Sequence, residues 1–146
     1  MPRYAMQTAV RAACVDMLED YATAASIKLQ VYPARPRSVN PPTAFVDNLS
    51  EATTYTGLLV QRLVTAEVIV MHGLFDSKVA ADQRDAFVDG FIDHVIDTIH
   101  AAGSNTTIGA ISTEDVPDYI NDWMPPAEQR TFYATRIVLE GLSLTG

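Results

Sequence analysis

The sequence predicts an α+β domain in which two principal helices pack on one face of an antiparallel β-sheet. Three observations support this prediction. Two segments have apolar residues at the three- and four-residue spacing of helices, and the other segments alternate apolar with polar residues or are rich in β-branched ones. The connections between successive strands are too short for parallel crossovers. The 146 residues are one domain's worth of chain, so we expect a single domain over residues 1–146.

The first helix is expected over residues 5–24. Val10, Cys14, Met17 or Leu18, and Tyr21 fall on one face of such a helix, because they follow one another at steps of three or four residues. Cys14 is the single cysteine of the chain, so it has no partner for an intrachain disulfide. Its apolar neighbours indicate a buried thiol rather than a reactive one.

The first strand is expected over residues 26–32, where apolar residues recur at every second position. The next ten residues, 33–42, contain four prolines, which cannot donate ladder hydrogen bonds. We expect this segment to be a stiff extended arm that presents Arg35 and Arg37, with an ordinary solvated loop as the alternative. A second short strand is expected over residues 43–49, followed by a polar turn over 48–54.

Residues 58–75 are expected to form one long strand or two paired strands ended by Gly73, because β-branched residues are dense there. Asp76 or Ser77 is the expected N-cap of the second helix, which runs to about Ala102 and is stopped by Gly103.

The rest of the chain is expected to hold a short strand over 107–112, an irregular aromatic loop over 113–128 and a last strand over 130–144. The loop contains Tyr119 and Trp123 and has too much apolar bulk to lie free in water. We therefore expect it to cover either the open face of the sheet or a partner.

The composition excludes several classes of protein. Ten lysines and arginines against eighteen acids give a net charge of −8, which repels phosphate backbones and argues against nucleic-acid binding. The apolar content of 48% is too high for a disordered chain, and no apolar run approaches the length of a membrane span. The first residues lack the apolar core of a signal peptide, so synthesis in a cytoplasm is expected.

No motif with a chemical signature is present. The glycines form neither a phosphate-binding loop nor a dinucleotide fingerprint, and no nucleophile elbow occurs. The segment His72, Asp76 and Ser77 holds the residue types of a nucleophilic site, but adjacent residues rarely adopt the required geometry, and helix capping is the simpler interpretation. We therefore expect no enzyme, no catalytic residue, no cofactor and no metal.

The second helix carries an acidic row at four-residue spacing, formed by Asp85, Asp89, Asp93 and Asp97. The row is either a solvated face, a surface that meets basic residues of a neighbouring subunit, or the lining of a negatively charged channel. Metal binding is less well supported, because stacked rows spread ligands along an axis. Ala86 and Gly90 allow another backbone to come close, either within the chain or from a second subunit.

Five phrases of the sequence carry a resemblance to a family. They are YPARPRSVNPPTAFVD at 32–47, HGLFDS at 72–77, QRDAFVDGFIDHV at 83–95, DVPDYINDWMPP at 115–126 and QRTFYATRIVLEG at 129–141. Within residues 26–141, the chain resembles the tail terminator, or tail completion, proteins of bacteriophages with long non-contractile tails, particularly those that infect actinobacteria.

The resemblance implies a virion structural protein that forms a ring, typically of six subunits, at the head-proximal end of the tail. Such a ring stops polymerisation of the tail tube protein and joins the tail to a head-tail connector protein, and DNA passes through it without specific binding. No catalysis or cofactor is implied. Interface candidates, from our own interpretation of the sequence, are Arg35, Arg37, Tyr119, Trp123, Arg130 and Arg136. Two alternatives are another head-closure or connector component and a small ligand-binding α+β domain.

Overall fold

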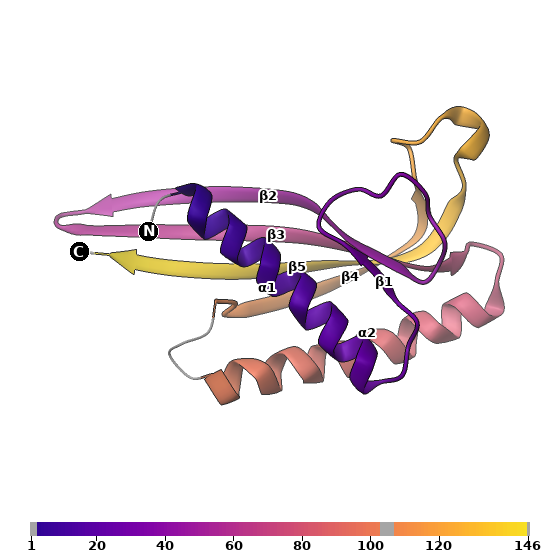
Figure 1. The fold of residues 1–146 in the computed structure, drawn as a ribbon, viewed down its shortest axis with the longest axis horizontal. Coiled ribbons are helices and arrows are strands. Elements are labelled where there is room, and N and C mark those ends of the chain that lie inside the picture. The colour runs from indigo at the N-terminus through magenta and orange to yellow at the C-terminus, as the bar shows by residue number, and fades with distance from the viewer. Residues whose placement is uncertain (1–2, 103–106, 146) are drawn as a thin grey trace.

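The computed structural model describes residues 3–102 and 107–145, and it confirms the α+β class. Within these ranges there are two α-helices, five strands and one short 3₁₀ helix. In chain order they are α1 (Arg3–Ala24), β1 (Gln30–Tyr32), β2 (Thr43–Thr56), β3 (Leu59–Leu74), α2 (Lys78–Ala102), β4 (Ala110–Ile120), η2 (Pro126–Glu128) and β5 (Thr131–Thr145). Figure 1 shows an elongated molecule whose strands run along its longest axis.

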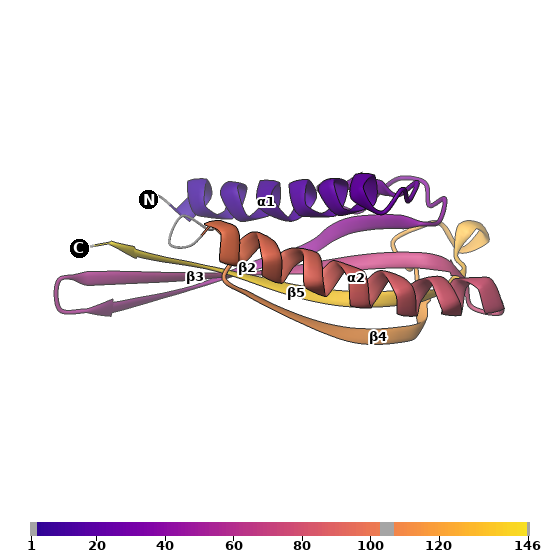
Figure 2. The ribbon, with the colours of Figure 1, turned by 90° about the horizontal axis from the view of Figure 1, so that it is seen from below.

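The five strands form one sheet in the order β1-β2-β3-β5-β4. All neighbouring pairs are antiparallel except β1 and β2, so the sheet is mostly antiparallel, as expected, with one parallel pair at this edge. The proline-rich segment 33–42 is long enough to act as the crossover between these two short paired stretches. Figure 2 shows α1 and α2 lying along the sheet.

Both helices pack on the same face of the sheet, as expected. Their apolar stripes meet alternate residues of the central strands in one buried cluster. It includes Val10, Cys14 and Leu18 of α1, Phe87, Phe91 and Val95 of α2, and Val64, Ala66, Val68, Val70, Ile137 and Leu139 of the sheet. Each of these sheet residues lies two positions from the next on its strand, which is the period that places side chains on one face.

A second, smaller core lies on the opposite face of the sheet. Phe45, Ile69 and Phe132 are buried there, and Val39 and Trp123 pack against them from two loops. The proline-rich segment therefore lies against the body of the protein, and its expected form as an extended arm is wrong. The loop alternative is the observed one, because burial of Pro36 and hydrogen bonding fix the segment in place.

The strand β2 is twice as long as the sequence predicts. Residues 48–54 continue the strand instead of forming a polar turn, and the chain reverses only at Gly57 and Leu58, since Thr56 pairs directly with Leu59. Gly57 has a φ of 60°, which suits the first central position of a type II′ hairpin turn. The segment that follows is a single strand, β3, with a register shift between Met71 and Gly73 near its end.

The strand β4 also extends further than predicted. The expected loop over 113–128 is wrong for residues 113–120, which pair with β5 as an edge strand. Pro117 is tolerated there because the register shifts between Val116 and Tyr119 and the strand has a free edge. The irregular segment is thus confined to about residues 121–130.

The limits of the helices agree well with the sequence. The first ends at Ala24, and Ser77 rather than Asp76 caps the second, because the Ala80 amide donates a hydrogen bond of 3.2 Å to Ser77 Oγ. The second helix reaches Ala102. The expected stop at Gly103 lies outside the described residues.

Candidate interface surfaces

Trp123 is the centre of a small cluster on the open face of the sheet. Its indole Nε1 donates a hydrogen bond of 2.9 Å to the Pro36 carbonyl, and its ring meets Phe45 edge-on at 5.1 Å. The Arg35 guanidinium lies 5.3 Å from the Trp123 ring centroid, and Arg35 Nε is 2.6 Å from Asp47 Oδ1. This cluster joins the two irregular segments to each other and to β2. The aromatic loop therefore covers the open face of the sheet, which was one of its two expected roles.

The electrostatics of this cluster agree with its geometry. The hydrogen bond with Asp47 raises the pKa of Arg35 above its usual value. Burial, followed by the nearby carboxylate of Asp47, raises the pKa of the Tyr119 hydroxyl well above its usual value. Arg35 therefore stays charged and Tyr119 stays neutral near neutral pH. The cluster is a fixed structural contact.

The other candidate arginines have different surroundings. Arg136 lies between two acids, with Nε 2.7 Å from Glu67 and Nη1 3.0 Å from Glu114. Arg130 donates hydrogen bonds to backbone carbonyls of its own loop. Arg37 is exposed and has no ion pair with any residue in the ranges 3–102 and 107–145. Of the four arginines, Arg37 is thus the one whose charge is not already engaged within the described chain.

The four aspartates of the acidic row are all exposed on α2. Asp85 is 3.4 Å from Arg84 Nε, and within the described ranges the other three have no ion pair. Arg84 also lies 3.9 Å from Asp115 of β4 and stacks over Tyr133, so its charge is shared. The row therefore presents mostly uncompensated negative charge to solvent.

Gly90 has an explanation within the chain. A side-chain carbon at this position would come within 3.0 Å of Tyr21 Cζ, so the glycine makes room for the tyrosine ring. That ring meets Phe87 and Phe91 edge-on at 5.2 and 5.6 Å. Of the two expected roles of this small-residue pair, close packing of α1 on α2 is the observed one at Gly90.

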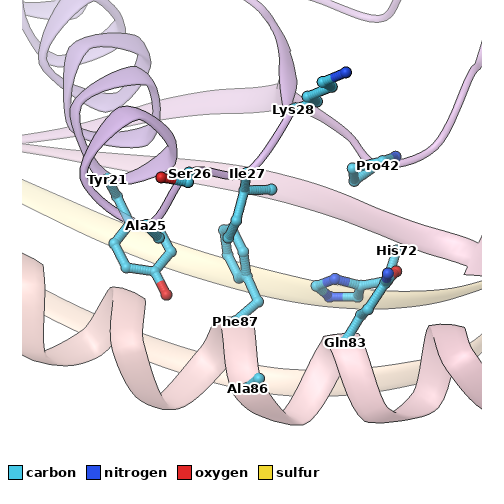
Figure 3. Close-up of a pocket in the computed structure, with 10 residues that line it drawn as sticks. All are labelled: Tyr21, Ala25, Ser26, Ile27, Lys28, Pro42, His72, Gln83, Ala86 and Phe87. Atoms are coloured by element: carbon cyan, nitrogen blue, oxygen red, sulfur yellow. The ribbon is translucent and has the colours of Figure 1, made fainter.

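A cavity of about 560 Å³ lies between the C-terminal end of α1, the first half of α2 and the end of β3. Its walls are mainly apolar, from Ala25, Ile27, Pro42, Ala86 and Phe87, and Figure 3 shows its lining. The polar groups do not converge on a common point, since the Lys28 ammonium points away from the His72 ring in that view.

The His72 side chain forms the floor of this cavity. Its Nε2 lies 2.9 Å from the Thr135 hydroxyl, and burial, aided by the positive charge of Arg84, lowers the pKa of His72 to about 4. The imidazole is therefore neutral near pH 7. Because Ser77 caps α2 and Thr135 is the hydrogen-bond partner of His72, the structure does not bring His72 and Ser77 together as a nucleophilic pair.

Sequence reasoning missed the most exposed apolar surface. The outer parts of β2, β3 and β5, residues 50–63 and 142–145, extend beyond the helices in Figures 1 and 2, and we call this region the overhang. Its exposed apolar residues include Tyr55 at 73%, Leu58 at 92% and Leu142 at 52% of their full areas. The signal that could have found it is the two-residue turn Gly57–Leu58, which separates two strand segments.

A second exposed apolar group lies at the opposite end of the molecule. Leu74 ends β3, Phe75 follows it, Val79 is in the first turn of α2, and Ile120 ends β4. All four residues are exposed. Phe75 stacks on Tyr133 with ring centroids 5.4 Å apart. The elongated domain thus exposes apolar side chains at both of its ends.

The described part of the chain offers no helix long and apolar enough to span a membrane. Among the same residues, no cluster of three or more histidine, cysteine or acidic side chains could hold a metal ion. A scan against protein-family models finds no match, and a search of curated protein sequences finds no significant match.

Proposed function

We propose that the protein is a virion structural protein that forms a ring at the head-proximal end of a phage tail tube. In this role it stops polymerisation of the tube and provides the surface that joins the head. The observation that carries the proposal is the presence of exposed apolar side chains at both ends of one elongated domain. Large contiguous apolar patches are uncommon on monomeric proteins and often mark surfaces that meet partners.

The two ends differ in structure, as a protein with several different partners requires. One end is a thin sheet whose outer strands lack helix cover, and the other is a compact corner of loops and the start of α2. A subunit of a ring stacked between a tail tube and a connector has to contact neighbouring copies as well as a different protein on each side, so it needs several distinct contact surfaces. The resemblance of five sequence phrases to tail terminators is the second support for this assignment.

The acidic row suits a ring through which DNA passes. Asp89, Asp93 and Asp97 are exposed and unpaired within the described residues, so they repel phosphates wherever they face DNA. Six copies of a chain with a net charge of −8 would carry −48 in total. A negative lining would let DNA pass without holding it.

Electron microscopy of purified protein mixed with tail tubes tests the proposal directly. We expect rings in solution or caps at one end of the tubes, and no further growth of capped tubes when tube protein is added. Packaged heads without tails serve as the comparison sample. Binding to heads alone would favour a head-closure component, and binding to neither would overturn the proposal.

The role of the acidic row is tested by the variant in which Asp89 and Asp93 are both changed to asparagine. If the row pairs with arginines across subunits, the ring should dissociate more readily than the wild type, and its wild-type stability should fall with added salt. If the row lines the passage, ring mass and salt response should stay unchanged. Mass measurement over a range of salt concentrations separates these two outcomes.

A further inference from the structure

The tip of the overhang is an apolar projection without charge. Leu58, the second residue of the hairpin turn, is 92% exposed, and Tyr55 and Leu59 beside it are 73% and 52% exposed. The ten residues 52–61 include no lysine, arginine, aspartate or glutamate, although the whole chain has a net charge of −8. An apolar tip at the end of strands with free edges is expected to be covered in the working state of a protein.

The cavity above His72 is the complementary feature. It has a volume of about 560 Å³ and is lined mainly by carbon atoms from α1, α2 and the residues between α1 and β1. Pockets that enclose apolar groups commonly have volumes of this order. His72 already has Thr135 as its hydrogen-bond partner, so an apolar occupant would not deprive that imidazole nitrogen of its contact.

The tip and the cavity cannot meet within one chain. Figure 1 shows the hairpin at one end of the longest axis, while β3 runs the length of the molecule before it reaches His72. Most of the length of β3 separates them, and the pairing of β3 with β5 from Val60 to Leu74 prevents the strand from folding back on itself. Any contact between these two surfaces therefore joins different copies of the chain.

The distribution of charge favours a second copy as the occupant. Copies with a net charge of −8 repel each other, and the aspartates of α2 lie beside the cavity wall at Ala86. An uncharged segment can approach this wall without like-charge repulsion, and the ten residues at the tip are such a segment. Lys28 is the only charged residue in the cavity lining, and its positive charge adds no repulsion to an acidic copy.

We propose that the end of the tip of one copy, with Leu58 as its leading side chain, docks in the cavity of the next copy. Since the tip and the cavity are different surfaces, the contact is head-to-tail, and its repetition closes a ring when the rotation between copies allows it. This inference rests on the proposed function and specifies the subunit contact of the proposed ring.

Two single variants test the contact from its two sides. Leu58→Asp places a charge at the tip, and Ala86→Trp fills the cavity from the exposed surface of α2. Each should weaken self-association about tenfold or more, measured by sedimentation over a range of concentrations. Ile120→Asp is the matched control, because it adds the same charge at an exposed apolar residue outside both surfaces. Association that is unchanged in both test variants would overturn the inference.

A mixing experiment uses the head-to-tail geometry. The Leu58→Asp chain keeps an intact cavity and the Ala86→Trp chain keeps an intact tip, so an equal mixture should form pairs of one copy of each and nothing larger. Pair formation also proves that both variants are folded. If both variants are monomeric and their mixture stays monomeric, the two surfaces do not meet, and the inference is wrong.

Disulfide trapping detects the proposed contact directly and does not depend on a variant that weakens self-association. A chain with Leu58→Cys is mixed with a chain with Ala86→Cys, and the native Cys14 does not interfere because burial raises its pKa to about 12. We expect crosslinked pairs from the mixture and far fewer from either chain alone. Absence of the mixed pair contradicts the docking.

The result is distinguishable from that of the tail-tube experiment. A ring that caps tubes but is insensitive to Leu58→Asp overturns this inference and leaves the proposed function standing. Head-to-tail pairs that never bind tubes support the inference and overturn the proposed function. A wild-type chain that is monomeric at every concentration overturns the inference, whatever the tube experiment gives.

Discussion

The covered part of the sheet and the overhang belong to the same three strands but differ in almost every physical property. Along β3, the residues from Val64 to His72 are nearly all buried, whereas those from Leu59 to Leu63 are exposed or half-buried. Along β2, Thr43–Val46 are buried and the last five residues are all exposed. Strand pairing continues from one region into the other, and the register shifts at Val46/Asn48 and Met71/Gly73 both lie in the covered part.

This difference shows that strand pairing and core formation are separable in this chain. In the covered part, two helices and two loops bury both faces of the sheet, so apolar burial stabilises the fold. In the overhang, pairing continues with almost no buried side chains, so its residues add little to stability and are free to contact a partner.

The largest effect is expected for Phe91→Ala in the covered part. Phe91 is fully buried and packs against Tyr21 and Phe87, so its truncation leaves a cavity that cannot collapse easily. We expect a loss of about 3–5 kcal/mol in the free energy of unfolding, measured by urea denaturation. Leu142→Ala in the overhang is the control, with an expected change of about 0.5 kcal/mol or less. Equal losses in the free energy of unfolding would show that the covered part and the overhang contribute alike to stability.

A second effect concerns the pH dependence of stability. Above about pH 7.5, one unit over the pKa of an unfolded histidine, His72 is almost entirely neutral in both the folded and the unfolded chain and contributes little pH dependence. As the pH falls from 6.5 towards 4, the unfolded chain binds a proton on this residue and the folded chain does not, so the folded state loses stability. The loss from this residue should reach about 3 kcal/mol at the lower end of the window.

The variant His72→Gln isolates this contribution. Its stability should fall less steeply than that of the wild type between pH 6.5 and 4, while the two profiles should run parallel above pH 7. Thermal unfolding in a series of buffers measures both profiles. Identical slopes in the two proteins would mean that His72 binds a proton in the folded chain as readily as in the unfolded chain. Water would then reach this part of the core more easily than the geometry indicates.

Gly141→Ala tests the border between the two regions. Gly141 lies on β5 opposite Val64, and an added carbon would approach the Thr107 carbonyl to 2.6 Å and Val10 Cγ2 to 2.8 Å. These two contacts show that α1 and Thr107 pack closely against the sheet at Gly141. We expect a destabilisation of about 1–3 kcal/mol in urea unfolding, because the backbone oxygen cannot move freely. Gly109→Ala is the control, since nothing lies within 4 Å of its added carbon. If Gly141→Ala leaves the free energy of unfolding unchanged, the border between the covered part and the overhang lies elsewhere.

Residue periodicity was sufficient to predict the covered part. The apolar stripes of the two helices, the alternation in the last strand and the Ser77 cap are local signals, and each lies where local chemistry and tertiary packing agree. The positions Val10, Cys14 and Phe91 are buried because they belong to those stripes. Within the covered part, the parallel pairing of β1 with β2, the length of β4 and the packing of the two loops depend on distant segments.

The overhang and β4 were harder to predict because their strands lack a buried face. The run from Asn48 to Thr54 is polar and was interpreted as a turn, but its threonines are good strand residues and every partner lies on β3. Pro117 likewise suggested a loop, although an edge strand with a register shift accommodates it. In such segments cross-strand pairing determines the structure, and pairing is not encoded in local hydrophobic periodicity.

The candidate surfaces were predicted in part. The exposure of the acidic row follows from helix geometry, which places residues four apart on one face. The engagement of Arg35 with Asp47 and Trp123 depends on how two distant loops fold back over the sheet, and no local pattern reports it. The exposed tip at Leu58 depends on where the helices stop covering the sheet, which is a property of the whole fold.

The smallest effect, and the strictest comparison of the two regions, comes from the same substitution at two positions of β3. Val60 and Val64 lie four residues apart on one strand and therefore point to the same face, but Val64 is fully buried and Val60 is only half-buried. Threonine has nearly the shape and strand preference of valine, so Val→Thr chiefly replaces a methyl group with a hydroxyl. At position 64 that hydroxyl enters the core without an arranged partner and should cost about 1–3 kcal/mol. At position 60 water can solvate it, and the change in urea unfolding, measured at high dilution, should stay within about 0.5 kcal/mol. A cost at position 60 equal to that at position 64 would show that the overhang is packed against something in the isolated chain, and its surface would then not be available to a neighbouring copy.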